Sequence, residues 1–162
     1  MSRTQGNIAN SSGNVLEQTV ISTFKAKGFE IEMYRVWEKN PNKYGDELLL
    51  KNVPYETIYG HSGNTEFLLK SKSRSLEIRI ECKWQQSAGS VDEKFPYLYL
   101  NCIESMPEKD IVIVVDGGGY KQGALDWIKN AIKDNKYQNE DTQKNIKIMS
   151  LIDFIKWANS NF

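Results

Sequence analysis

One stretch of the sequence, residues 60–86, predicts two neighbouring strands and thereby constrains the fold of the whole chain. Its second half, Leu76–Trp84, alternates apolar and charged side chains. Because successive side chains of a strand point to opposite faces of a sheet, this segment has one apolar and one charged face. The apolar face carries Ile78, Ile80, Cys82 and Trp84, and the charged face carries Glu77, Arg79, Glu81, Lys83 and Gln85.

A second carboxylate comes from the preceding predicted strand, where Glu66 stands within residues 65–69. Two carboxylates side by side repel each other unless a cation or a proton lies between them. Hard cations such as Mg²⁺ prefer oxygen ligands and often use one or two carboxylates together with substrate phosphate. Glu66 and Glu81 therefore predict a site for Mg²⁺ or Mn²⁺. The alternative interpretation is a solvated strand face with a surface ion pair between Glu81 and Lys83.

The remaining patterns predict a mixed α/β domain. Residues 1–12 are polar and predicted to be flexible, and residues 13–162 are predicted to form a single domain. Helix followed by several strands and then by alternating helices and strands indicates an α/β fold, one mixed sheet with helices on both sides. Helices are expected over residues 15–27, 91–104, 122–136 and after Ser150, and further strands over residues 29–37, 48–50, 55–59, 111–115 and 145–149.

Glu17 interrupts the apolar side of the first predicted helix. At about 100° per residue, it projects into the arc formed by the apolar side chains of that helix. A carboxylate in this position needs a partner or a polar site to face. Two interpretations are open: a rim residue that reaches solvent or an arginine, or a third acid of the metal site. The apolar arc consists of Leu16, Val20, Ile21 and Phe24.

Composition excludes some classes of protein. No apolar run reaches the length of about 18 residues that a transmembrane helix needs, so we expect no membrane association. The polar first residues lack the apolar core of a secretory signal, which favours the cytoplasm. In that compartment Cys82 and Cys102 are expected to be reduced and buried.

Charge gives no overall signature of nucleic-acid binding, because 21 basic residues balance 21 acidic ones. A local basic stripe can still attract a phosphate backbone. The predicted turn between the two central strands is basic, and a solvated loop and a DNA contact are equally open interpretations. Its cations are Lys70, Lys72 and Arg74, with Arg79 close behind them, and His61 and Lys94 are further candidates for DNA contact.

The arrangement of these acids resembles the PD-(D/E)XK nuclease superfamily, which includes restriction enzymes, junction resolvases and repair nucleases. The matching residues are Glu17 in the first helix, Glu66 as the strand acid, and the tripeptide Glu81-Cys82-Lys83. The resemblance covers about residues 13–149. Within the superfamily, the chain is similar to small stand-alone members carried by phages and bacteria. It departs from the family at Glu66, where Asp is usual, and Asp46 is the reserve candidate for this acid.

The resemblance implies a restriction-endonuclease-like fold and a metal-dependent cleavage of DNA, duplex or branched. Glu66, Glu81 and the carbonyl of Cys82 would bind Mg²⁺ or Mn²⁺, and Lys83 would orient the attacking water or stabilise the developing charge. Gln85 would position the water or a phosphate. Because one catalytic core cuts one strand, a homodimer or higher oligomer is expected for duplex cleavage. The alternative is a non-catalytic nucleic-acid-binding or assembly module on the same fold.

Overall fold

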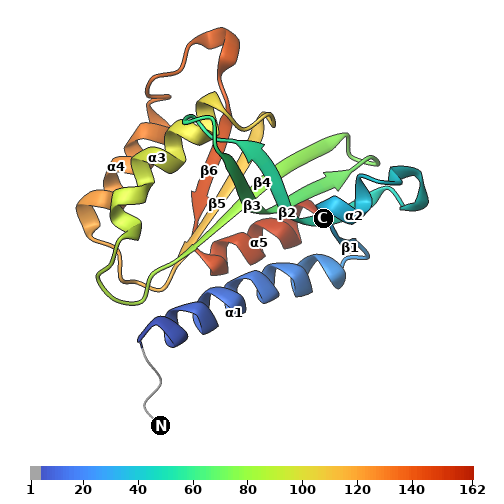
Figure 1. Ribbon diagram of the computed structural model, residues 1–162, viewed down its shortest axis with the longest axis horizontal. Coiled ribbons are helices and arrows are strands. Elements are labelled where there is room, and N and C mark those ends of the chain that lie inside the picture. Colours follow the sequence, from blue (N-terminus) through green and yellow to red (C-terminus); the bar gives the residue numbers. More distant parts are fainter. Residues whose placement is uncertain (1–4) are drawn as a thin grey trace.

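A computed structural model describes residues 5–162 and builds them around one mixed six-stranded sheet (Figure 1). The strands lie in sequence order across the sheet, with β2, β3 and β4 antiparallel and the outer neighbours parallel. This confirms the predicted α/β fold with a mixed central sheet. The strands are β1 (Glu30–Met33), β2 (Glu47–Glu56), β3 (Ser62–Ser71), β4 (Leu76–Trp84), β5 (Asp110–Asp116) and β6 (Asn145–Met149).

Helices cover both faces of this sheet. Figure 1 shows α1 and α5 side by side on one face and α3 and α4 on the other, with α2 at the end where β1 and β2 pair. Two short 3₁₀ helices lie in loops, over Pro41–Lys43 and Glu140–Thr142. The helices are α1 (Gln5–Lys25), α2 (Tyr34–Trp37), α3 (Val91–Glu104), α4 (Gln122–Lys133) and α5 (Leu151–Asn161).

The strand β5 shows how the two layers share the core. Its apolar run alternates between the layers, with Val112 and Val114 packed towards α1 and α5. Ile111, Ile113 and Val115 pack instead towards α3 and α4. A continuous apolar run is the pattern expected of a strand that is buried on both faces. Apolar side chains therefore cover both faces of the sheet at its centre. A buried polar side chain on the neighbouring strand β4 needs a specific explanation.

Several predicted boundaries were wrong. The first helix begins at Gln5 and not at Val15, since a helix can include the weak helix formers Gly13 and Asn14 at a cost of about 1 kcal/mol for Gly. Of the segment predicted to be flexible, residues 5–12 are helical and residues 1–4 lie outside the described residues.

Two strand predictions also differ from the structure. The strand predicted over residues 29–37 ends at Met33, because Tyr34 and Trp37 form one helical turn and pack together over an apolar cluster on β2. The two short strands predicted on either side of Pro54 are one strand, β2. Pro54 is accommodated because β1 pairs only with the first part of β2, so that no ladder hydrogen bond is needed at its nitrogen.

Candidate active site

The strands β2 and β3 change the phase of their side-chain alternation together. Leu50 and Val53 lie in the same apolar cluster, although period two would put them on opposite faces. Between them Asn52 has a φ of 51°, the left-handed conformation that Asn adopts more readily than most residues. On β3, Phe67 packs towards α1, whereas Thr65 turns to the other face. The β2–β3 hairpin therefore turns over at this level and separates from β4.

Glu66 occupies the gap that this separation opens. The β3–β4 ladder ends with the pair Phe67 and Ile80. Beyond that pair, Oε2 of Glu66 accepts a hydrogen bond from the main-chain N–H of Cys82 at 2.8 Å, in place of a strand carbonyl. Since the N–H and C=O of one strand residue point to the same neighbour, the carbonyl of Cys82 faces this gap too. Two of the oxygen donors predicted for the metal thus lie together.

Glu81, the residue before Cys82 in β4, adds a buried carboxylate. Its Oε1 pairs with Nζ of Lys83, while its Oε2 is buried and has no hydrogen-bond partner among the described residues. Burial, and then the charge of Glu66, raise the pKa of Glu81. Burial alone would lower the pKa of Lys83, but Glu81 and Glu66 raise it, so Lys83 stays protonated. The site holds more negative charge than Lys83 alone can balance.

Glu17 reaches this site from α1, which packs against β4. Burial, and then the charge of Glu66, raise its pKa, and the charges of Lys51 and Lys83 oppose that rise. Glu17 is therefore close enough to Glu66 and Lys83 for their charges to act on it. Sequence reasoning missed Lys51, because nothing in its local pattern distinguishes it from other strand lysines.

The donor set suits a hard divalent cation. Two carboxylates and a main-chain carbonyl offer oxygen ligands only, and the unpartnered Oε2 of Glu81 is the kind of atom that a cation satisfies. Within residues 5–162, no group of three or more His, Cys, Asp or Glu side chains is placed to hold a metal. Glu66 and Glu81 are two such side chains, so Glu17 does not complete a group of three carboxylates with them.

Comparison with known families decides the identity of the fold. A family model described as a PD-(D/E)XK nuclease superfamily domain matches residues 8–162. The chain belongs to the PD-(D/E)XK nuclease superfamily. No curated protein and no solved structure matches it significantly. Membership indicates a nuclease-type function on a nucleic-acid substrate, and nucleases of this superfamily generally use divalent metals.

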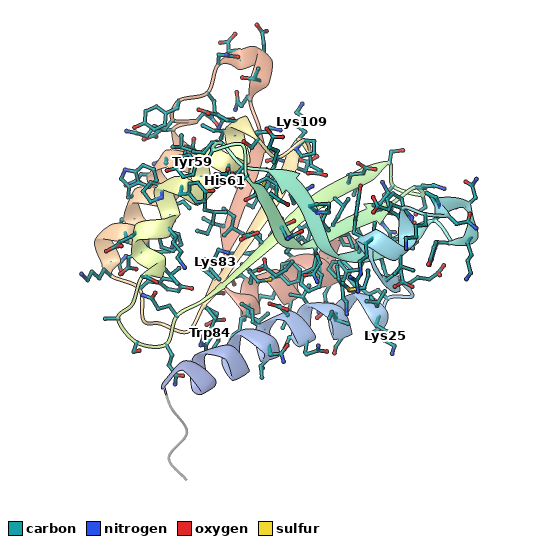
Figure 2. All side chains as sticks on the ribbon, in the orientation of Figure 1. Lys25, Tyr59, His61, Lys83, Trp84 and Lys109 are labelled. Atoms are coloured by element: carbon teal, nitrogen blue, oxygen red, sulfur yellow. The ribbon has the colours of Figure 1, made fainter. Side chains whose placement is uncertain are left out.

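In this member of the PD-(D/E)XK superfamily, Glu66, Glu81 and Lys83 lie where the gap between β3 and β4 opens. Figure 2 shows Lys83 and Trp84 on opposite sides of β4, with Lys83 towards α3 and Trp84 towards α1. Trp84 is partly buried and packs against the apolar cluster on the α1 side, at the edge of the core in which it was predicted. Among the described helices, none has the length and apolar character that a bilayer crossing requires.

Two tyrosines that sequence reasoning missed border the candidate site. Tyr55 packs on the α3 side of the sheet, with the guanidinium of Arg79 5.5 Å from its ring centroid. Burial, and then the charge of Glu81, raise the pKa of its hydroxyl to about 12. Tyr120 donates a hydrogen bond from its hydroxyl to the carbonyl of Lys83 at 2.6 Å and so fixes the end of β4. No short motif marks either residue, since both reach the site through the tertiary fold.

Gln85 has its side chain engaged in the scaffold. Its Oε1 accepts from the N–H of Val91 and its Nε2 donates to the carbonyl of Gly119, each at 3.0 Å. The turn at Gly117 and Gly119 lies so close to β4 that an added Cβ would stand within 2.7 Å of main-chain atoms of Gln85 or Gln86. Gln85 thus ties β4 to the start of α3, and the predicted role in positioning a water gains no support from these bonds.

The basic residues of the β3–β4 turn lie at the opposite end of these strands. At roughly 3.3 Å per residue, Glu77 and Lys83 are about 20 Å apart along β4. Arg79 does not belong to a surface cluster: its guanidinium is buried, pairs with Glu108 and bonds to Thr65. Each of the three turn cations has an acidic partner, in the pairs Lys70–Glu77, Lys72–Asp46 and Arg74–Glu47.

His61 and Lys94 lie nearer to the site end of the sheet. Both are exposed, His61 at the tip of the β2–β3 hairpin and Lys94 in the first turn of α3. His61 contacts the ring of Tyr59 edge-on, and Lys94 has no ion-pair partner in the described part of the chain. Their predicted contact with DNA stays a prediction. Asp46, the reserve acid, pairs with Lys72 at the far end instead.

Proposed function

We propose that this protein is a metal-dependent endonuclease that hydrolyses DNA phosphodiester bonds. One observation carries the proposal: the buried Glu81 has an unpartnered oxygen, lies next to Glu66 and is only partly balanced by Lys83. Burying uncompensated carboxylates is costly to stability, so an arrangement of this kind is typical of a functional site.

Glu66, Glu81 and the carbonyl of Cys82 would hold Mg²⁺ or Mn²⁺, which when bound supplies charge stabilisation at the scissile phosphate and lowers the pKa of a water ligand. The bond from the N–H of Cys82 fixes one carboxylate oxygen of Glu66 and leaves the other for a further partner. The chain thus orients its ligands before any substrate arrives.

Lys83 has the charge and position to act on the phosphate. Its protonated ammonium carries donors beyond the one used by Glu81, so it can hold the attacking water or the developing negative charge. Glu17, which is half-buried beside Glu66, is proposed to hold a water of the same site. A homodimer or higher oligomer would let two such sites cut both strands of duplex DNA.

The direct test is cleavage of supercoiled plasmid DNA by the purified protein. We expect nicked and linear products with Mg²⁺ or Mn²⁺, and none with EDTA or with Ca²⁺. Glu81→Gln should abolish cleavage while keeping the fold, because the amide has the same shape as the carboxylate but cannot ligate as an anion.

Metal binding is measured separately through thermal unfolding. A ligand that binds only the native state raises the melting temperature by mass action. Mn²⁺ should therefore raise the melting temperature of the wild type but not that of Glu81→Gln. An intact protein that binds DNA yet cuts none of it with either metal would establish the non-catalytic binding module instead.

A further inference from the structure

An exposed pair of tyrosines bridges the β2–β3 hairpin and α3. Tyr59, in the hairpin turn, is 68% exposed. Its ring stacks on that of Tyr97 in α3, with centroids 5.1 Å apart and planes at 25°. Figure 2 shows Tyr59 and His61 at the hairpin tip, over α3. A single exposed ring is ordinary on a protein surface, but here two rings from different elements are stacked and one of them faces solvent. We call this pair the tyrosine shelf.

The shelf is held rigidly. Asn101 of α3 is buried, and its Oδ1 accepts a hydrogen bond from the N–H of Ile58, the residue before Tyr59. The turn is closed further by the N–H of Thr57, which donates to the carbonyl of His61 at 2.8 Å. A preorganised aromatic surface loses little entropy when a ligand stacks on it. The hairpin tip is therefore fixed to α3, with one aromatic ring presented to solvent.

The shelf is connected to the candidate active site through Tyr55. Tyr55 packs against the apolar cluster of α3, and the guanidinium of Arg79 lies 5.5 Å from the centroid of its ring. Arg79 and Glu81 are two residues apart on β4, so Tyr55 lies on the face of the sheet that carries both Glu81 and α3. On the shelf side, Lys94 lies one helical turn before Tyr97, where residues three apart share a face of α3. A DNA strand that passes the acids can thus meet a lysine that has no ion-pair partner among the described residues, and an aromatic ring, on the same side of the sheet.

We propose that the tyrosine shelf stacks an unpaired base of the DNA substrate, so that the protein acts on DNA with a single-stranded segment. The inference rests on the proposed nuclease function. Bases in an intact duplex are stacked on each other and offer no free face, whereas every unpaired base has one and stacks on aromatic side chains regardless of sequence. The occupant that fits the shelf is therefore a base beside the scissile phosphate, in a single strand or at the unpaired junction of a branch.

The test uses short DNA that carries 2-aminopurine, whose fluorescence falls when the base stacks. Binding is measured in Ca²⁺ for a single strand and for a blunt duplex of the same sequence. Tyr59→Ala should weaken single-strand binding about tenfold or more, the scale of one base stacked on an aromatic ring, and remove the fluorescence change. Tyr59→Phe should keep both, because the hydroxyl is not needed for stacking.

The matched control is Tyr137→Ala, since Tyr137 is also 67% exposed but lies beyond α4. It should leave binding and fluorescence unchanged. Wild-type affinity for the single strand in Tyr59→Ala, or an equal loss for single strand and duplex, would overturn the proposal. The assay reads binding alone, so a protein that cuts no DNA refutes the nuclease function without deciding the shelf. Melting temperatures show that each variant is folded.

Discussion

The two ends of the β3–β4 strand pair carry similar residues in opposite electrostatic situations. At the turn end every cation has its own acid near the surface, in the pairs of Lys70, Lys72 and Arg74. At the other end three acids gather around Lys83, and Glu81 among them is buried with one oxygen unpartnered. Charge is balanced and exposed at one end, and unbalanced and enclosed at the other.

This difference distinguishes charges that are explained by stability from those that we propose to be functional. Exposed ion pairs contribute about 0–1 kcal/mol each, and solvent carries most of the cost of their charges. A buried carboxylate without full compensation lowers stability, so its presence points to a role that stability does not explain. Composition alone hides the contrast, because the whole chain is neutral.

The largest effect is expected for Lys83→Ala. If Lys83 stabilises negative charge in the transition state, its loss should lower the single-turnover cleavage rate by about 100-fold or more. DNA affinity in Ca²⁺ should change little, since one contact among many phosphate contacts is a small share of binding.

Lys70→Ala is the matched control at the turn end, because Lys70 also pairs with a glutamate of β4. It should cut at the wild-type rate. If Lys83→Ala cuts as fast as Lys70→Ala does, the two ends are equivalent and the catalytic assignment of Lys83 fails.

The two ends should also respond to pH with opposite signs. A carboxyl whose pKa is raised in the folded state binds protons more tightly there. The metal-free protein should therefore lose stability through Glu81 as pH rises above 4.5, the ordinary pKa of a glutamate. The slope from one such group is at most about 1.4 kcal/mol per pH unit. Lys83, with a raised pKa, contributes stability that is constant over this range.

At the turn end, burial would raise the pKa of Glu47, but hydrogen bonds from Ser73 and Ser71 and the charge of Arg74 lower it. Glu47 therefore stabilises the folded state at pH values above its ordinary pKa of 4.5, and this stabilisation is lost as pH falls below that value. Urea unfolding in EDTA between about pH 2.5 and pH 8 measures both, because the loss due to Glu47 falls below its ordinary pKa of 4.5. Glu81→Gln should flatten the loss of stability towards high pH, and Glu47→Gln the loss towards low pH. A wild-type slope that persists unchanged in Glu81→Gln would contradict the assignment to Glu81.

The third prediction concerns the bend at Asn52, where the β2–β3 hairpin turns over and separates from β4. Asn52→Val should destabilise the protein by about 1–2 kcal/mol, because β-branched residues tolerate the left-handed conformation poorly. For a domain of this size that is a loss of roughly 2–4 °C in melting temperature per kcal/mol. If the strand straightens, Glu66 loses its place, so the stabilisation by Mn²⁺ should shrink as well.

Asn52→Gly supplies the control, since Gly adopts this conformation without strain. It should keep both the stability and the response to Mn²⁺. Equal behaviour of the Val and Gly variants would mean that the bend does not position Glu66.

Sequence patterns predicted the parts of this structure that depend on local order. The bounds of β4, α3 and β6 agree with the predicted segments because alternation and helical spacing are properties of neighbouring residues. The phase change at Asn52 was not predicted, since it depends on the hairpin folding over α3. For the same reason the pattern gave no sign of Tyr55 or Lys51, which come from a strand that looked interrupted at Pro54.

The candidate site was predicted in the same partial way. The spacing of Glu66, Glu81 and Lys83 is local to two strands, and the structure brings them together at the end of the ladder. The acids that neutralise Lys72 and Arg74 are 26 or more residues away in sequence, on the loop before β2 and at its start. A sequence pattern therefore shows that a turn is basic, but it does not show that the turn's charge is already balanced.

The smallest effect is expected when Lys72 and Arg74 are both changed to Ala. A loop that tracks the DNA backbone would release counterions on binding, and removing two contacts would reduce the slope of log affinity against log salt by nearly two. Because Asp46 and Glu47 already balance these cations, about 20 Å from Lys83, we expect neither the affinity nor the slope to change. Lys94→Ala, which removes a cation without an ion-pair partner in the described chain, should lower the slope by about one. Titrations at several salt concentrations in Ca²⁺ compare the variants. A flatter slope in the double variant would place the turn on the DNA and show that a balanced surface charge can still be used for binding.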